Sequence, residues 1–482
     1  MNIFNTILEK IKFLILENKD ELNIENLNDF KGVVVESPPT KFNYDLSSNI
    51  CLILAKLNNL NPVELADKFK IKLIEEKNYF DEIEVAGPGF LNFRLKDFFL
   101  KSIVKEILIS NKTYGSKKSN KNYNIEFVSA NPTGPMHVGH CRGAIFGDVL
   151  SNLLKFNGNT VTKEYYINDY GNQIKNFTKS VFLRIREIKF KEKYINEKNL
   201  YPGEYIIEIA QKILNDKVDI DYDNFLHSYE VLSKESLNHS MNMIKSDLIN
   251  LGIVHDNFFS ESELVKKNLV NVAVNTLKEN KFVENGYLDP PKSEDIKNWK
   301  KIKRLIFKST IFGDDADRAL QKNDGTWTYF ANDVAYHSDK ISRKYDSLIN
   351  ILGADHTGYI KRITAAVSAL SNNKVKLHCK VCQLVKLYKN GKPYKMSKRA
   401  GDFISVNDLL KEVNKDSIRF MMLSRSNDVE LDFDFDKVLE KTKDNPVFYI
   451  QYCYARINSL FKSLNLDIND TINMNTERFI LN

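Results

Sequence analysis

Two histidines, His137 and His140, stand three residues apart in the run HVGH at the start of a helical pattern. Residues at this spacing share one helix face. The first turn of a helix also presents backbone N–H groups and the positive end of the helix dipole, which favour a phosphate. Gly139 and Gly143 would let a flat ligand approach the backbone. The run therefore indicates a polyphosphate site, although two histidines alone also fit a surface accident or half of a metal site.

A second candidate for phosphate binding is the cationic run KMSKR at 395–399, which follows a predicted turn at Asn390 and Gly391. Lysines on such a loop could neutralise a polyphosphate, but a solvated basic loop fits equally well. A lone CxxC at Cys379 and Cys382 has no second pair of the kind that zinc requires, so we predict no tightly bound protein metal.

Bulk composition sets the class of protein. The 482 residues are enough for two to four domains, and the formal charge of +7 is compatible with a polyanionic partner without identifying one. No apolar run approaches the roughly 18–20 residues of a membrane span. The N-terminal stretch carries Glu9, Lys10 and Lys12, which favours an amphipathic helix over a signal peptide. Five cysteines do not make a disulfide scaffold, so we expect a cytoplasmic protein without a membrane partner.

The elements around HVGH predict a parallel sheet. A strand over 124–128 leads through a Pro/Gly-rich loop into a helix that starts at Met136 and stops near Gly158. A second strand over 161–167 completes a βαβ unit, whose ligands gather at the carboxyl ends of the strands. Neither GxGxxG nor GxxxxGK[ST] occurs, which excludes the usual dinucleotide and P-loop fingerprints.

The rest of the chain extends this α/β pattern. Residues 1–110 read as a small α+β module and 111–122 as a polar linker. A mostly helical, charged segment fills 172–303. Strands are expected over 304–308, 348–352 and 375–387, a helix over 358–370, and further helices from 407 onward. We therefore predict a Rossmann-like parallel sheet interrupted by a helical insertion, with a small α+β domain before it and a partial helical bundle after it.

Together, HVGH at 137–140 and KMSKR at 395–399 resemble the HIGH and KMSKS motifs of the class I aminoacyl-tRNA synthetases, in the same order and structural settings. The intervening runs narrow the resemblance to arginyl-tRNA synthetases. These runs are EFVSANPTGPMHVGHCRGA (126–144), NDYGNQI (168–174), YPGEYIIEIA (201–210), KSTIFGDDADRAL (308–320), TYFANDVAYH (328–337), GADHTGYIKR (353–362), KMSKRAGDF (395–403) and NPVFYIQYCYARI (445–457).

The resemblance implies an arginine–tRNA ligase. The carboxylate of arginine would attack the α-phosphorus of ATP, giving arginyl-adenylate and pyrophosphate, and the arginyl group would pass to the terminal adenosine of its tRNA. Such chemistry needs positioning and charge stabilisation. The resemblance assigns ATP, with Mg²⁺, to the two motifs; the residues are His137, Gly139, His140, Lys395, Met396, Ser397 and Lys398.

The resemblance also implies an arginine pocket. Carboxylates suit a planar guanidinium with five donors. Tyr329 and Asp333, four apart on one helix face, match the guanidinium-recognising pair of the family, and Glu126 matches a second acidic contact. Ser129 and Asn131 match the residues at the α-amino and carboxylate ends. The competing interpretation is that Asp333 pairs structurally with Lys340 or Arg343. Past a later strand, the expected adenosine-side residues are Gly353, Asp355 and His356.

The resemblance implies three domains: an additional tRNA-binding domain at 1–110, the catalytic domain at 120–430 with a helical insertion over roughly 175–303, and part of an anticodon-binding bundle at 431–482. We expect a monomer whose partners are arginine and tRNA(Arg), and which needs tRNA to activate arginine. Two rivals remain from the sequence: another adenylate-forming nucleotidyltransferase of this fold, and an inactive RNA-binding paralogue.

Overall fold

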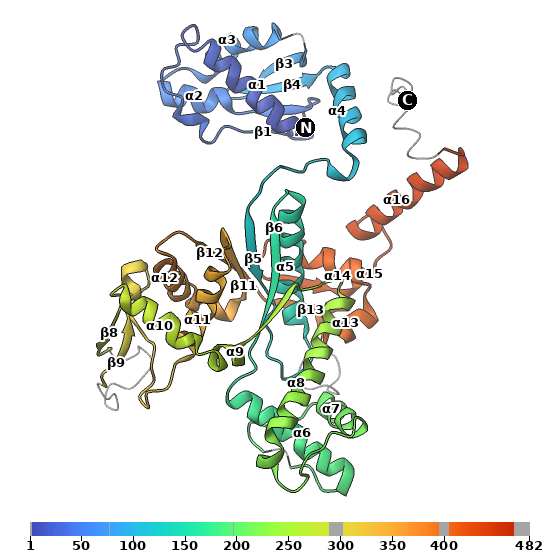
Figure 1. Cartoon of the computed structure of the whole chain (residues 1–482). Helices are drawn as coiled ribbons and strands as arrows, with labels where there is room; N and C mark the ends of the chain where they lie inside the picture. The colour runs from blue at the N-terminus through green and yellow to red at the C-terminus, as the bar shows by residue number, and fades with distance from the viewer. Residues whose placement is uncertain (1, 77, 196, 289–301, 395–403, 467–482) are drawn as a thin grey trace. The chain divides into compact units, whose positions relative to one another are not determined.

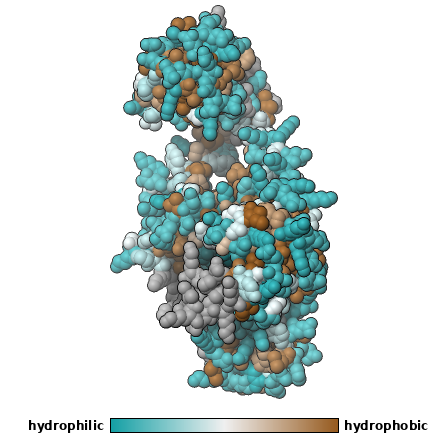
Figure 2. Space-filling view, turned by 90° about the vertical axis from the view of Figure 1, so that its left-hand side faces the viewer, coloured by the Kyte–Doolittle hydropathy of each residue, from teal (hydrophilic) through white to brown (hydrophobic). Residues whose placement is uncertain are grey.

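The computed structural model describes residues 2–76, 78–195, 197–288, 302–394 and 404–466 (Figure 1). The chain divides into two compact units, one of Met1–Ser116 with Tyr454–Asn482 and the other of Lys117–Cys453. Within the described residues, no helix has the length and apolar character needed to cross a membrane. On the face drawn in Figure 2, hydrophobic residues form small patches among hydrophilic ones.

The N-terminal residues build a small α+β structure, as predicted. Four strands pair in an antiparallel sheet of order β1-β2-β4-β3. Their bounds are β1 (Val35–Glu36), β2 (Leu46–Ser48), β3 (Phe80–Ala86) and β4 (Phe90–Leu95). One core joins this sheet to the helices α1 (Ile3–Glu17), α2 (Ile50–Asn58) and α3 (Pro62–Ile74), and α4 (Asp97–Ser110) follows.

A five-stranded parallel sheet forms the centre of the second unit. Its order is β12-β11-β5-β6-β7, with β5 (Asn122–Glu126), β6 (Thr160–Ile167), β7 (Asn257–Ser260), β11 (Ser347–Gly353) and β12 (Lys376–Cys382). From β5 the sheet is extended on one side by β6 and β7 and on the other side by β11 and β12, so the strand order reverses between β5 and β11. In such sheets, ligands bind beyond the carboxyl ends of the strands at this point. Glu126 and Gly353 end these two strands.

Both faces of the sheet are buried, which explains its apolar strands. Side chains alternate between the faces: Ile349 and Ile351 pack in one core, and Leu348 packs in the other. The first core includes α5 (Val138–Phe156), α8 (Phe225–Asn250), α13 (Val406–Glu412) and α14 (Lys415–Met422). The second includes α10 (Leu269–Glu279), α11 (Tyr329–Ser342) and α12 (Ile360–Ser371), on the other side of the sheet in Figure 1.

The predicted helical insertion over 175–303 requires a correction. Its first part is helical: α6 (Asn172–Phe190), α7 (Glu204–Asn215) and α8 share a core of their own. The chain then returns to the main sheet as β7, and α9 (Glu261–Lys266) follows. A separate antiparallel sheet contains β8 (Val283–Gly286), β9 (Arg304–Phe307) and β10 (Arg318–Ala319). The prediction missed β7 because four residues, NFFS, are too few to show strand periodicity.

The segment after β12 also differs from the prediction. The strand expected over 375–387 is two strands in different sheets, because the Gln383 N–H donates to the Asn427 carbonyl and takes the chain out of β12. A second sheet pairs β13 (Val385–Lys389) with β14 (Lys392–Pro393) and β15 (Leu431–Asp434). The predicted turn between β13 and β14 is confirmed, with Asn390 and Gly391 both at positive φ.

The predicted helical bundle from 431 onward begins instead with β15, which runs parallel to β13. Only then do α15 (Phe435–Leu439) and α16 (Pro446–Ser463) follow. Leu431 and Phe433 alternate with polar residues and are buried, which is the short strand pattern that the sequence reading overlooked.

Candidate active site

His137 and His140 form the N-terminal cap of α5. Nδ1 of His137 accepts a hydrogen bond from the Gly139 N–H (3.1 Å), and Nδ1 of His140 accepts one from the His137 N–H (3.3 Å). The two rings stack with centroids 3.8 Å apart. Because both Nδ1 atoms accept, each neutral ring carries its proton on Nε2. The motif therefore presents two imidazole donors, and the helix terminus itself is partly capped.

Burial keeps these imidazoles neutral. It lowers the pKa of His137, and with the neighbouring His137 ring it lowers the pKa of His140 to about 3. The glycine between them has a steric role: a Cβ on Gly139 would lie 2.8 Å from Cε1 of His137. Gly139 thus allows the His137 ring to fold back over the first turn.

The chain that leaves the lysine loop is attached directly to the histidine motif. Residues 395–403, and with them Lys395, Met396, Ser397 and Lys398, lie outside the described residues. Immediately after them, the Ile404 carbonyl accepts from the Val138 N–H, and the Met136 carbonyl accepts from the Val406 N–H, both at 3.0 Å. The segment 404–406, about 265 residues after the histidine motif in sequence, therefore pairs with the start of α5.

Arg142 on α5 also connects this helix to the segments around β13 and β15. Its guanidinium is almost completely buried and donates to four backbone carbonyls at 2.6–3.4 Å, namely those of Gln383, Arg425, Ser426 and Val429. These carbonyls precede or flank β13 and β15. Helix α5 is thus fixed to the sheet from which the lysine loop emerges.

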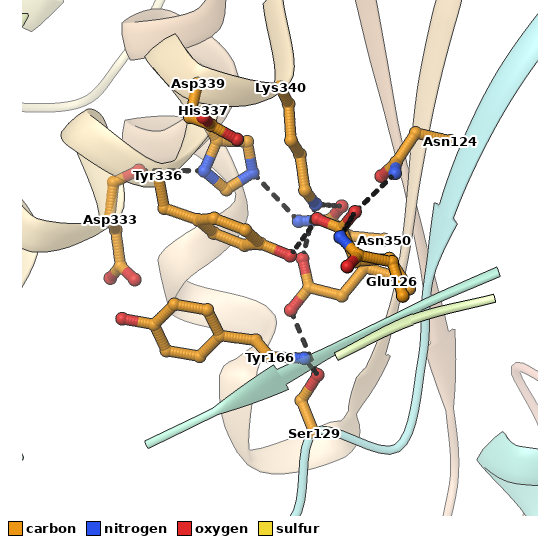
Figure 3. A network of polar contacts seen from close by, with 12 residues as sticks. Asn124, Glu126, Ser129, Tyr166, Asp333, Tyr336, His337, Asp339, Lys340 and Asn350 are labelled. Carbon is orange, nitrogen blue, oxygen red and sulfur yellow. Dashed lines mark hydrogen bonds and ion pairs between the residues drawn. The ribbon is translucent and has the colours of Figure 1, made fainter. Parts of the chain in front are cut away.

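An acidic region lies beside the end of β5 (Figure 3). Asp333 on α11 is partly exposed, and its carboxylate accepts a hydrogen bond from the Tyr359 hydroxyl. Burial raises the pKa of Asp333 to about 7; the Tyr359 bond and the charge of Lys340 lower it, and the charges of Glu126 and Glu261 raise it further. Such a carboxylate gains from a bound cation.

Glu126 is held by the chain's own donors. Its Oε2 receives Nζ of the fully buried Lys340 (2.6 Å), and its Oε1 receives the Ser129 hydroxyl (3.2 Å). The Ser129 oxygen in turn accepts from the Tyr166 N–H (3.1 Å). Lys340 also donates to Asn350 (3.2 Å). These bonds fix the orientation of the Glu126 carboxylate before any ligand binds.

The geometry does not support the competing interpretation, a structural ion pair of Asp333 with Lys340 or Arg343. Among the residues that the structure describes, ion pairs join Lys340 to Glu126, and Arg343 to Glu164 and Asp339; none joins either cation to Asp333. Both cations are thereby engaged with other carboxylates.

The remaining predicted residues are more exposed. Asn131 accepts from the Asn168 amide (3.2 Å), and Tyr329, 68% exposed, opens α11 one turn before Asp333. Just past the end of β11, Asp355 and His356 are both exposed, and Nε2 of His356 lies 3.4 Å from Oδ2 of Asp355. Gly353 ends β11 next to them, and a Cβ there would lie 2.6 Å from Oδ1 of the exposed Asp355 side chain, which can move away.

Sequence reasoning missed Tyr166, Glu261 and Tyr359. Tyr166 stands near the carboxyl end of β6, next to β5, so strand order could have indicated it. Glu261 follows β7, which the sequence did not reveal. Its Oε1 accepts from the Asn332 amide (2.8 Å). Tyr359 lies within a run already noted for its resemblance, but nothing local signals its contact with Asp333.

Comparisons with known proteins fit this geometry. The family model for "tRNA synthetases class I (R), catalytic domain" matches residues 103–460, and "Arginyl tRNA synthetase N terminal domain" matches 3–95. The arginine–tRNA ligase of Pelagibacter ubique is 53% identical over 99% of this chain and 84% of its own. That of Bartonella bacilliformis is 45% identical over 98% and 82%.

The fold agrees with a solved structure as well. The arginyl-tRNA synthetase of Thermus thermophilus superposes with a TM-score of 0.63 over 93% of this chain and 82% of its own, at 19% identity. Another adenylate-forming nucleotidyltransferase of this fold, one of the two rivals considered from the sequence, does not account for a match over nearly the whole chain. The chain belongs to the arginyl-tRNA synthetase family of class I aminoacyl-tRNA synthetases, which use ATP to join arginine to its tRNA.

Proposed function

We propose that Asp333 binds the guanidinium of arginine beyond the carboxyl ends of β5 and β11, with Glu126 as a second, pre-oriented acceptor. Tyr329 lines the same approach, and Ser129 and Asn131 hold the α-amino and carboxylate ends. One observation carries the proposal: the two cations nearest along α11, Lys340 and Arg343, pair with other carboxylates. Neither of these cations pairs with Asp333, so its carboxylate can pair with a ligand cation.

On the nucleotide side, His137 and His140 donate Nε2–H groups to the phosphates or ribose of ATP, and Gly139 keeps the His137 ring in place. We assign Lys395, Met396, Ser397 and Lys398 to ATP as well, with the lysines neutralising the leaving pyrophosphate. Gly353, Asp355 and His356 lie toward the adenosine. Mg²⁺ would arrive with the phosphates of ATP, whose charge it offsets.

For the whole chain, we propose a tRNA-binding module at 1–110, a catalytic domain at 120–430 and an anticodon-binding segment within 431–482. The last begins after β15, with the helices that follow it. The protein acts as a cytoplasmic monomer on tRNA(Arg).

The residue assignments can be tested by ATP–pyrophosphate exchange in the presence of tRNA(Arg). The wild-type chain should exchange with arginine and not with lysine, ornithine or citrulline, because each of these leaves a pocket carboxylate without its paired donors. Asp333→Asn should lose most of its preference for arginine over neutral citrulline, while the ATP KM stays within about twofold.

Asp339→Asn is the matched control, because Asp339 lies on the same helix and pairs with Arg343. It should keep the preference for arginine. An Asp333→Asn variant that still prefers arginine as strongly as the wild type would place the guanidinium elsewhere.

A further inference from the structure

Tyr359 makes the hydrogen bond that orients Asp333. It ends the short helical segment η5 (Ala354–Tyr359), which follows β11 directly. Its hydroxyl donates to Oδ2 of Asp333, 26 residues away in sequence. Among the described residues this is the one side-chain donor that reaches that carboxylate within hydrogen-bond distance.

The tyrosine ring is itself held firmly. Phe330 of α11 packs against it edge-on, with centroids 6.3 Å apart. The Arg362 guanidinium of α12 lies over the Tyr359 ring, with its Cζ 5.1 Å from the ring centroid. With these neighbours the hydroxyl has little freedom to leave Asp333. The carboxylate is therefore oriented before any ligand arrives, which reduces the cost of ordering it on binding.

We propose that Tyr359 is a positioning residue for arginine selection: by holding one oxygen of Asp333, its hydroxyl orients that carboxylate so that the other oxygen faces the guanidinium. This inference rests on the proposed role of Asp333.

The charges around Asp333 give the hydroxyl its importance. The titratable groups that face it come from five elements: Glu126 on β5, Tyr166 on β6, Glu261 on α9, Lys340 on α11 and Tyr359 on η5. Burial and two carboxylates oppose ionisation of Asp333, whereas Lys340 and the Tyr359 bond favour it. Because Lys340 is already paired with Glu126, the tyrosine is the donor whose removal changes Asp333 directly.

Tyr359→Phe tests this role, since it removes one oxygen and keeps the ring. In pyrophosphate exchange at pH 7 with tRNA present, the arginine KM should rise about tenfold, as expected for one hydrogen bond to a charged group. Without the donor, Asp333 protonates at higher pH, so the midpoint of the KM–pH profile should move up. The defect should shrink to about threefold or less at pH 8.5, where Asp333 is ionised in both proteins.

Tyr336→Phe is the matched control. It removes a buried hydroxyl from α11 that donates to Glu164 (2.7 Å) and not to Asp333. Both variants should lose some thermal stability, but only Tyr359→Phe should move the pH midpoint. An unchanged arginine KM in Tyr359→Phe, or a defect of equal size at every pH, would overturn the proposal.

Asp333→Asn separates the two levels of the proposal. If it leaves the arginine KM unchanged, the proposed pocket is wrong. If it raises the KM while Tyr359→Phe does not, only the role of Tyr359 is wrong. The double variant should be no worse than Asp333→Asn alone, because the hydroxyl acts through the carboxylate.

Discussion

Two acidic side chains lie within the same layer between the sheet and α11, and the protein surrounds them in opposite ways. Glu164 on β6 is completely buried and receives both guanidinium nitrogens of Arg343 (2.5 and 2.8 Å). It also accepts from the side chains of Asn124, Asn257 and Tyr336, at 2.7–3.1 Å. Burial alone would raise its pKa, but the bonds and charges of these donors bring the pKa down to about 2.

Among the described residues, Asp333 has a single side-chain donor, Tyr359, and burial raises its pKa to about 7. The two carboxylates differ most in the supply of donors. Every acceptor position of Glu164 serves to join β5, β6, β7 and α11, so nothing is left for a ligand. Asp333 remains short of donors, which is unfavourable for folding and favourable for binding a guanidinium. Four predictions test this contrast.

The largest effect should come from the saturated carboxylate. Glu164→Gln removes the buried carboxylate that pairs with the Arg343 guanidinium and leaves that cation with Asp339; breaking a buried pair of this kind costs about 3–5 kcal/mol of unfolding free energy. Urea denaturation would measure it. The folded fraction should retain an arginine KM within a few-fold of wild type. A stability loss below about 1 kcal/mol would show that the hydrogen bonds and ion pair of Glu164 do not stabilise the fold.

Asp333→Asn should show the reverse pattern. Losing a paired, charge-assisted contact should raise the arginine KM by about 100-fold, or roughly 2.7 kcal/mol. Unfolding free energy at pH 8 should be equal to or higher than that of wild type, because an under-paired buried charge is removed. Steady-state kinetics and urea denaturation on one preparation would measure both. A large loss of stability would instead make Asp333 a structural residue.

The pH dependence of stability should separate the two carboxylates again. Glu164 has a folded-state pKa below its ordinary value, so its stabilisation is present above about pH 4.5 and is lost as pH falls toward 2. Asp333 has a raised pKa, so its destabilisation is present above about pH 7 and disappears as protonation proceeds below it. The stability gap between wild type and Asp333→Asn should therefore close between pH 8 and 5. Urea midpoints over this range would measure it, and a constant gap would contradict the assignment.

Local pattern was enough for the elements that carry the two predicted sites. The helical spacing after Met136, the strand over 161–167 and the apolar run before Gly353 all reappear as α5, β6 and β11. Asp333 was found through a resemblance, and its position one turn after Tyr329 follows from helical spacing alone. The sheet order, however, joins strands more than 200 residues apart, which no local pattern encodes.

What the sequence could not supply is the pairing of charges. Arg343 and Glu164 are 179 residues apart, and Lys340 and Glu126 are 214 apart. Sequence proximity suggested Lys340 or Arg343 as partners for Asp333, and only the fold shows that both face other carboxylates. Tyr359 was missed for the same reason, because its contact depends on how η5 turns back toward α11.

The smallest predicted effect concerns Ser129, which holds Glu126, the second acidic residue of the proposed arginine site. Its hydroxyl donates to Glu126 and accepts from the Tyr166 N–H, and its φ of 41° lies in the left-handed region. Ser129→Ala should raise the arginine KM two- to fivefold and cost about 1 kcal/mol of stability, because one backbone donor loses its partner. Ser129→Gly loses the same hydroxyl but suits the positive φ, so its KM should rise equally while its stability falls less. If the two variants differ in KM as much as in stability, then backbone conformation, and not the Glu126 contact, sets arginine affinity at this end of the pocket.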